Sequence, residues 1–244
     1  MNAAVVQLTA RTLLGQRRTL LVGLLALVPV AMALLFRLAA PEDADPARFT
    51  ARALLGGIVT TTILPLVSLV LGTAAFGQDF EDGTAVYLLG KPLPRWRIVL
   101  SRLVTAWLIA AAVLIPTTAA AGLVARQSAD PALVLGFTLA VPVGALLYLA
   151  LFTWLSVLTS RALVAGLLYV FLWEGVISGI FSGVRFFSIR QYTLGLADAF
   201  FDLPAVFDPR LSPLQAALLS AAVLPLFTVL AIRRLERWEI GESA

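Results

Sequence analysis

The chain has 244 residues, of which 60% are hydrophobic and 13% charged, with a formal net charge of +4 and a mean hydropathy of +0.96. An average soluble domain carries about twice this fraction of charged residues, so the composition indicates an integral membrane protein. The absence of cysteine and histidine excludes disulfides, thiolate nucleophiles, imidazole metal ligands and Ser-His-Asp triads.

Six stretches with few or no charges are long enough to cross a bilayer, since about 20 helical residues span about 30 Å of hydrocarbon. Their apolar residues show no two-residue alternation, which favours helices over strands. The sequence therefore predicts a single all-α domain. Residues 1–18 are expected to form an interfacial amphipathic helix or, equally, the frayed start of the first span. The predicted spans are about 19–36, 53–76, 103–125, 132–158, 162–183 and 211–232.

The basic residues are distributed unevenly between the two sides of these spans. The larger share of the 18, including the clusters at 91–102 and 233–237, falls on the side that carries both termini. Because basic residues favour the cytoplasmic side, both termini of this multi-pass protein are predicted to be cytoplasmic. A composition rich in Ala, Leu and Arg, with a single lysine, favours a bacterial cell membrane as its location.

Between the second and third spans, acidic residues are followed by apolar and then basic ones. Acidic residues suit the start of a short helix, and Gly90-Lys91-Pro92 would end it. The exposed apolar face of such a helix favours a docking surface below the membrane. The alternative is a helix in the lipid headgroups, whose basic residues bind anionic lipid. The candidate docking residues are Asp79, Glu81, Asp82, Gly83, Thr84, Tyr87, Leu88, Leu89, Lys91, Pro92 and Arg95.

This segment resembles the coupling helix of the ABC-2 family of ABC-exporter permeases. A weaker likeness lies in the fifth span and the residues after it. The resemblance implies a dimeric permease with a substrate groove between two six-helix halves, moved by separate ATP-hydrolysing subunits that grasp the coupling helices. The residues that carry it are Glu81-Asp82-Gly83-Thr84, Tyr87-Leu88-Leu89, Lys91-Pro92 with Arg95, and then Tyr169, Trp173, Glu174, Gly179 and 188–192.

The chain has no G-x-x-x-x-G-K-[ST] loop to bind phosphates, so it would depend on a partner ATPase. The resemblance implies that ATP and Mg²⁺ bind to that partner, with no cofactor, metal or catalytic residue in this chain. A second copy or a sister permease would complete the transporter within the lipid membrane, and nucleic acid is not an expected partner. The alternatives are an ion-coupled secondary transporter, a membrane assembly factor or an intramembrane enzyme, for which the coupling or catalytic residues are missing.

Glu174 is the ionisable residue well inside a predicted span, where a carboxylate is costly and usually functional. It would line the transport path, bond structurally to a neighbouring helix or dimer mate, or relay protons. Gly175, Gly179 and Gly183 are spaced four apart, which favours close helix packing, either between subunits or within one. Residues 185–210 are rich in aromatics, which favours short re-entrant or interfacial helices at the outer side, with a plain loop as the alternative.

Overall fold

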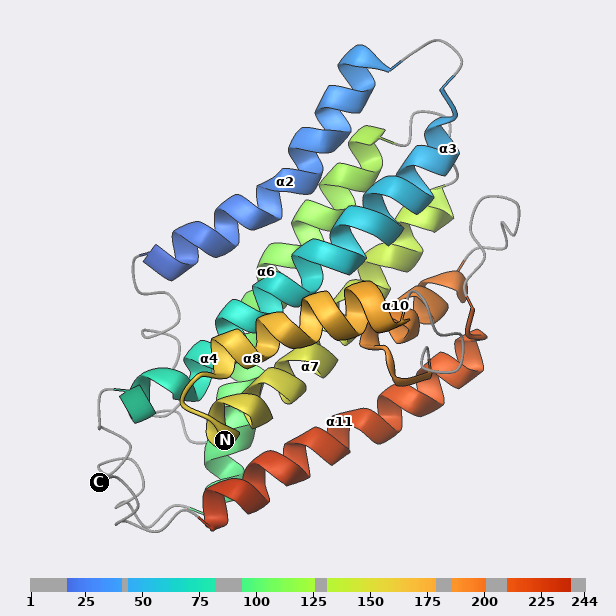
Figure 1. Cartoon of the computed structure of the whole chain (residues 1–244). Coiled ribbons are helices and arrows are strands. Elements are labelled where there is room, and N and C mark those ends of the chain that lie inside the picture. Colours follow the sequence, from blue (N-terminus) through green and yellow to red (C-terminus); the bar gives the residue numbers. More distant parts are fainter. Residues whose placement is uncertain are drawn as a thin grey trace.

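The computed structural model describes residues 17–40, 44–81, 94–125, 131–178, 186–200 and 210–237. Every secondary-structure element in these residues is a helix, which confirms the all-α prediction. The helices assemble into a bundle (Figure 1). The elements are α2 (Arg17–Ala39), α3 (Pro46–Arg48), η1 (Phe49–Ile63), α4 (Leu64–Glu81), α6 (Arg95–Ala125), α7 (Pro131–Leu158), α8 (Ala162–Leu168), η2 (Tyr169–Ile177), α10 (Ile189–Asp198) and α11 (Pro213–Glu236), where η marks π-helical turns.

Among the described residues, five helices are long and apolar enough to cross a membrane. They lie at the positions of the first, second, third, fourth and sixth predicted spans. The helix at the fifth position, Ala162–Ile177, is apolar but shorter, and the rest of that predicted span lies outside the described residues. The six-span count therefore stays a prediction.

The second and third long helices begin well before the predicted spans. The second starts at Pro46 and the third at Arg95, whereas the sequence predicted residues 53 and 103. The prediction ended each span at the nearest charge, because charges are costly at the bilayer centre. Exposed arginines near a helix end, such as Arg48, Arg52 and Arg97, keep their charge in water while the helix continues, so the helices extend past the apolar runs.

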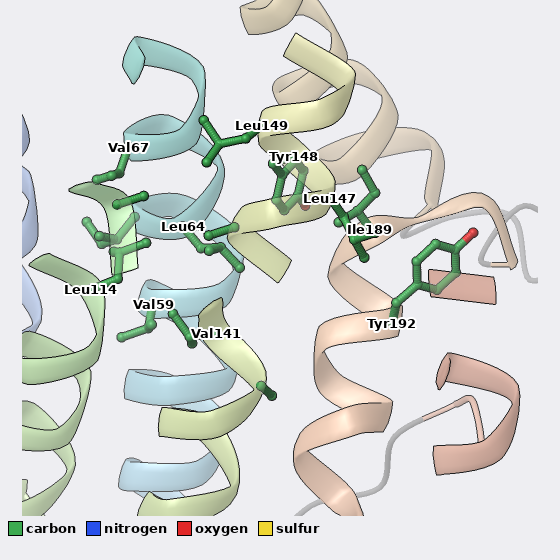
Figure 2. Close-up of a cluster of buried hydrophobic side chains, with 14 of the residues drawn as sticks. Val59, Leu64, Val67, Leu114, Val141, Leu147, Tyr148, Leu149, Ile189 and Tyr192 are labelled. Carbon is green, nitrogen blue, oxygen red and sulfur yellow. The ribbon is translucent and has the colours of Figure 1, made fainter. Parts of the chain in front are cut away.

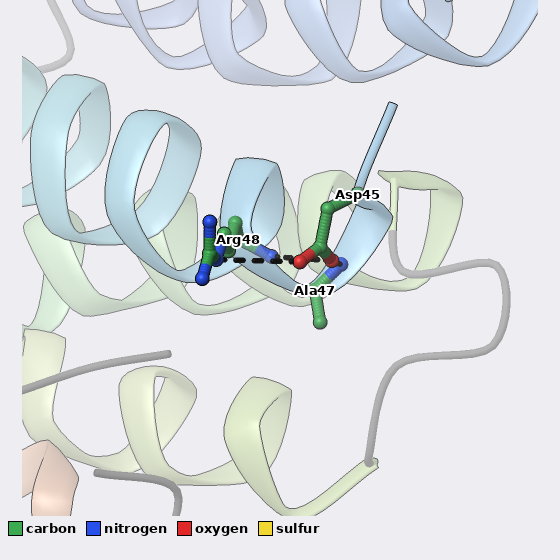
Figure 3. Close-up of polar contacts among 3 residues, drawn as sticks. All are labelled: Asp45, Ala47 and Arg48. Carbon is green, nitrogen blue, oxygen red and sulfur yellow. Dashed lines mark hydrogen bonds and ion pairs between the residues drawn. The ribbon is translucent and has the colours of Figure 1, made fainter. Parts of the chain in front are cut away.

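Asp45 begins the second long helix (Figure 3). Its Oδ1 accepts hydrogen bonds from the backbone N–H groups of Ala47 at 3.0 Å and Arg48 at 3.1 Å. Its Oδ2 lies 3.4 Å from Arg48 Nε, and Pro46 occupies the first helical turn. Two backbone donors that a helix start leaves unpaired are thereby satisfied. The helix then runs through α3, η1 and α4.

Helix α7 is the centre of the bundle, in contact with α4, α6, α8, α10 and α11. Figure 2 shows side chains from η1, α4, α6, α7 and α10 meeting in one apolar cluster. Phe137, Tyr148 and Phe152 of α7 are fully buried there. Because the short α10 contributes Ile189 and Tyr192 to this cluster, it is an integral part of the bundle.

Helices α2 and α11 lie on opposite flanks of the bundle (Figure 1). Their most apolar stretches are only 22% and 17% buried, whereas the corresponding stretches of the three other long helices are 56% to 67% buried. Exposed leucines such as Leu24 on α2 and Leu218 on α11 cover these flanks. Such wide apolar surfaces are stable against lipid or a second membrane subunit.

Candidate coupling segment and intramembrane polar site

The structure describes only the two ends of the predicted coupling segment. Asp79 and Glu81 belong to the backbone of α4, and Arg95 is the first residue of α6. The sequence placed the acidic residues at the start of a separate short helix. Instead α4 continues to Glu81, since each added residue of an existing helix gains a hydrogen bond whereas a new helix needs a new nucleus. The other predicted docking residues, Asp82, Gly83, Thr84, Tyr87, Leu88, Leu89, Lys91 and Pro92, lie outside the described residues.

Arg102 joins the two helices that flank this segment. Its Nη1 donates a hydrogen bond to the carbonyl oxygen of Ala75 on α4. Its guanidinium lies over the ring of Phe76, 4.6 Å from the ring centroid, and the residue is 4% exposed. A desolvated guanidinium over an aromatic ring is a favourable contact. The sequence had placed Arg102 in a surface row of basic residues, because periodicity alone does not show that an arginine near a helix start turns inward.

An apolar cluster surrounds this joint. Side chains from the ends of four helices pack together here, and Trp154 and Ile232 lie against them. Since α4 and α6 both contribute, a displacement of the segment between them would reach α7 and α11 directly. The buried members are Ala75 and Phe76 of α4, Ile98 and Val99 of α6, Val157 of α7, and Ala231 and Leu235 of α11.

Glu174 lies in η2 and is 1% exposed. Its Oε1 accepts hydrogen bonds from the hydroxyls of Tyr148 on α7 and Tyr169 on η2, each at 3.1 Å. Phe152 packs between these tyrosines, stacked on Tyr148 and edge-on to Tyr169. The aromatic packing fixes the hydroxyls in position, so the carboxylate meets two oriented donors.

The same carboxylate also binds the N-terminus of α10. Its Oε1 accepts from the backbone N–H groups of Ile189 at 2.9 Å and Arg190 at 3.4 Å, and its Oε2 accepts from the hydroxyl of Ser188. Ser188 also caps α10 by accepting from the Gln191 N–H. A negative charge at a helix N-terminus is favoured by the helix dipole and by the unpaired N–H groups.

Glu174 thus accepts five hydrogen bonds from donors of α7, η2 and the start of α10. Four of these donors meet Oε1, whereas Oε2 accepts from the hydroxyl of Ser188. Because these bonds reach α7 and the start of α10, the geometry favours, among the three roles predicted from the sequence, the structural bond to neighbouring helices.

Two further bonds tie the residues before α10 to the rest of the site. Trp173 Nε1 donates to the carbonyl oxygen of Phe187 at 3.2 Å. The hydroxyl of Tyr192 donates to the carbonyl oxygen of Phe186. A short helix does occur within the aromatic stretch 185–210, and it packs on α7 and α11. Glu174 and these aromatic contacts together hold α10 against η2.

Gly175 faces outward from η2. A Cβ atom built there would meet only the carbonyl oxygen of Val170, at 3.7 Å, so none of the other helices described in the structure approaches it. Gly179 and Gly183 lie outside the described residues. The close approaches inside the chain involve glycines that the sequence did not single out: at Gly72 of α4, a Cβ would lie 2.8 Å from Phe152 Cβ, and Gly166 of α8 packs against Leu69 and Phe152.

Most of these helices lie within a match to a known protein family. A family model described as "ABC-2 family transporter protein" matches residues 16–189. The match begins at α2, ends at the start of α10, and includes the segment between α4 and α6 as well as Glu174. A comparison with curated proteins gave no match.

Proposed function

The chain belongs to the ABC-2 family of transporter proteins, and on that premise we propose that it is the transmembrane permease subunit of an ATP-driven ABC exporter. It forms part of the substrate path in a bacterial cytoplasmic membrane, with both termini in the cytoplasm. ATP and Mg²⁺ bind to a separate nucleotide-binding subunit. The chain contributes motion and a path for the cargo, and no catalytic group.

The joint at Arg102 carries this proposal. A segment of acidic, apolar and basic residues connects α4 to α6, and Arg102 links these helices through Ala75 and Phe76 next to the connection. A partner that grasps the segment would therefore move α4 and α6 as one unit. The apolar cluster around the joint would pass this motion to α7 and α11.

In the proposed mechanism, the helices of the bundle move together as one body. Glu174 fixes η2 and α10 to α7, so these elements would shift together. In a dimer with a second copy or a sister permease, such a shift would open the groove between subunits alternately to either side. The exposed apolar faces of α2 and of η2 around Gly175 provide surfaces for lipid or for that second subunit.

Co-purification tests the proposal. The chain is tagged, expressed in its native host and solubilised mildly, and the recovered complex is assayed for ATP hydrolysis. We expect an ABC ATPase in stoichiometric amount. Charge reversal with Glu81→Lys and Asp82→Lys should reduce its recovery about tenfold, because like charges across an interface are repulsive.

The matched control is Arg161→Glu, which reverses an exposed charge before α8 outside the segment and should leave recovery unchanged. A second variant, Gly83→Pro, should keep the bundle folded while abolishing the stimulated hydrolysis. Recovery of the chain without any ATPase, or an undiminished complex in the double reversal, would count against the proposal.

A further inference from the structure

A cavity of about 240 Å³ lies between α7 and α11. Trp154 of α7 forms one wall, and α11 supplies Leu230, Arg233, Arg234 and Arg237. Arg233 and Arg234 lie three and four residues after Leu230, and Arg237 lies four and three residues after them, so the four residues share one face of α11. A different face, with Ala231 and Leu235, packs into the apolar cluster at the Arg102 joint. The residues of α11 that line the cavity therefore lie on a different face from those that pack into the apolar cluster.

The cationic lining of this cavity lacks an anion. Within the described residues, none of the three guanidiniums lies within ion-pair distance of a carboxylate; Glu236, in the same turn, is exposed and forms no such pair. The Nε of Arg234 is buried without a hydrogen-bond partner. A buried donor that stays unpaired is destabilising, more so on a charged group. The site thus has unused capacity for an anion.

The other part of the lining is apolar. Trp154 packs against Phe227, with their ring centroids 5.5 Å apart, and Leu230 lies one turn further along α11, before the arginines. The cavity therefore passes from apolar to cationic towards the end of the helix. Next to it, Leu226 and Val229 are exposed on α11. An acyl chain could lie along this surface while a phosphate reached the arginines.

We propose that this cavity binds the headgroup of an anionic phospholipid. The chemistry recognised is a phosphate attached to an apolar tail. A lipid is favoured over a free phosphate because the apolar stretch of α11 is only 17% buried, which gives bilayer lipids direct lateral access to the cavity. The lipid would bind α11 to α7 beside the Arg102 joint. This site is independent of the proposed transport function.

The test uses the full chain in a neutral detergent, titrated with phosphatidylglycerol or phosphatidylcholine and examined by native mass spectrometry. The wild-type chain should bind phosphatidylglycerol at least tenfold more tightly. Replacing Arg233, Arg234 and Arg237 together by Gln should weaken binding about 100-fold, since each basic residue near an anionic surface contributes about fivefold. The single Arg237→Gln change alters an exposed residue, leaves the fold intact and should weaken binding about fivefold.

Arg161→Gln is the matched control, because Arg161 is exposed and does not line the cavity; it should retain wild-type affinity. Equal affinity for the two lipids, or unchanged binding in both arginine variants, would overturn the proposal. So would displacement of the lipid by free glycerol 3-phosphate at equal concentration, which would identify a soluble anion site. Lipid binding that appears only after deletion of residues 238–244, which include Glu239 and Glu242, would mean that the chain's own C-terminal segment occupies the cavity.

Discussion

Glu174 in η2 and the arginines near the end of α11 are charges in the same bundle with opposite surroundings. Glu174 accepts hydrogen bonds from five donors of this chain. Arg234 has a buried Nε with no acceptor, beside two further guanidiniums that form no ion pair with any described residue. A charge bound by several donors of its own chain ties neighbouring helices together, whereas a buried guanidinium nitrogen without an acceptor has capacity for a partner outside the chain.

Arg102 is intermediate between these two cases. It is buried like Glu174, and its partners include a backbone carbonyl and an aromatic ring. In the proposed mechanism, its position next to the predicted coupling segment would give this joint a mechanical role. Removing each of these charges in turn would show which of them stabilises the fold.

The largest effect is expected from Glu174→Ala. The change leaves the hydroxyls of Tyr148 and Tyr169 and the first N–H groups of α10 without their acceptor, so the protein should lose about 3 kcal/mol of stability. Glu174→Gln keeps the shape and one acceptor oxygen and should cost about half as much. Thermal unfolding in detergent, followed by size-exclusion chromatography, measures both. A Glu174→Ala protein as stable as wild type would refute the structural role.

Arg102→Leu should cost about 2 kcal/mol, because it removes a charged hydrogen bond and the contact with the Phe76 ring. Arg97→Leu is the control, since Arg97 also lies over a ring, that of Trp96 at 5.2 Å, but is exposed. It should change stability by less than about 1 kcal/mol. The comparison uses the same thermal assay, together with ATP hydrolysis by the complex. Equal effects of the two substitutions would show that burial of Arg102 does not matter.

Gly72→Ala and Gly175→Ala separate internal packing from an outward face. A methyl group at Gly72 would meet Phe152 Cβ, an atom close to the backbone, so we expect a loss of about 2 kcal/mol. At Gly175 the space is open, and alanine should be neutral or slightly stabilising, because glycine is unfavourable inside helices. If instead Gly175→Ala lowers the yield of the dimer without changing the stability of the monomer, that face is a subunit contact.

Apart from the control substitutions, Asp45→Ala should give the smallest loss of stability, about 1 kcal/mol, through loss of the helix cap. Its ion pair with Arg48 is exposed and adds little. Asp45→Asn keeps an accepting oxygen and is the matched control, with an expected change of a few tenths of a kcal/mol. Circular dichroism during thermal unfolding measures both, and equal losses would assign the effect to the charge instead of the cap.

The sequence predicted the helices better than their ends and partners. Long apolar runs were sufficient to locate the five long helices, because about 20 apolar helical residues are needed to cross a bilayer. The actual start of α6 at Arg95 was missed, since a charge-based boundary cannot recognise that Arg102 turns inward onto Phe76. The burial of Glu174 was expected, but its partners were not. Tyr148 lies in α7, whereas Ser188 and the first N–H groups of α10 form a second, separate part of the chain, and only the fold brings the two together at Glu174.

The central claim, that the segment between α4 and α6 docks on an ATPase, can be tested by cross-linking because the chain has no cysteine of its own. A single cysteine is introduced at Leu88 in the segment or at Leu214, an exposed residue at the start of α11, and is labelled with a photoactivated cross-linker in native membranes. We predict a covalent product with an ABC ATPase for Leu88→Cys and none for Leu214→Cys. Cross-links from Leu88→Cys to lipid alone, with no ATPase product, would contradict the account.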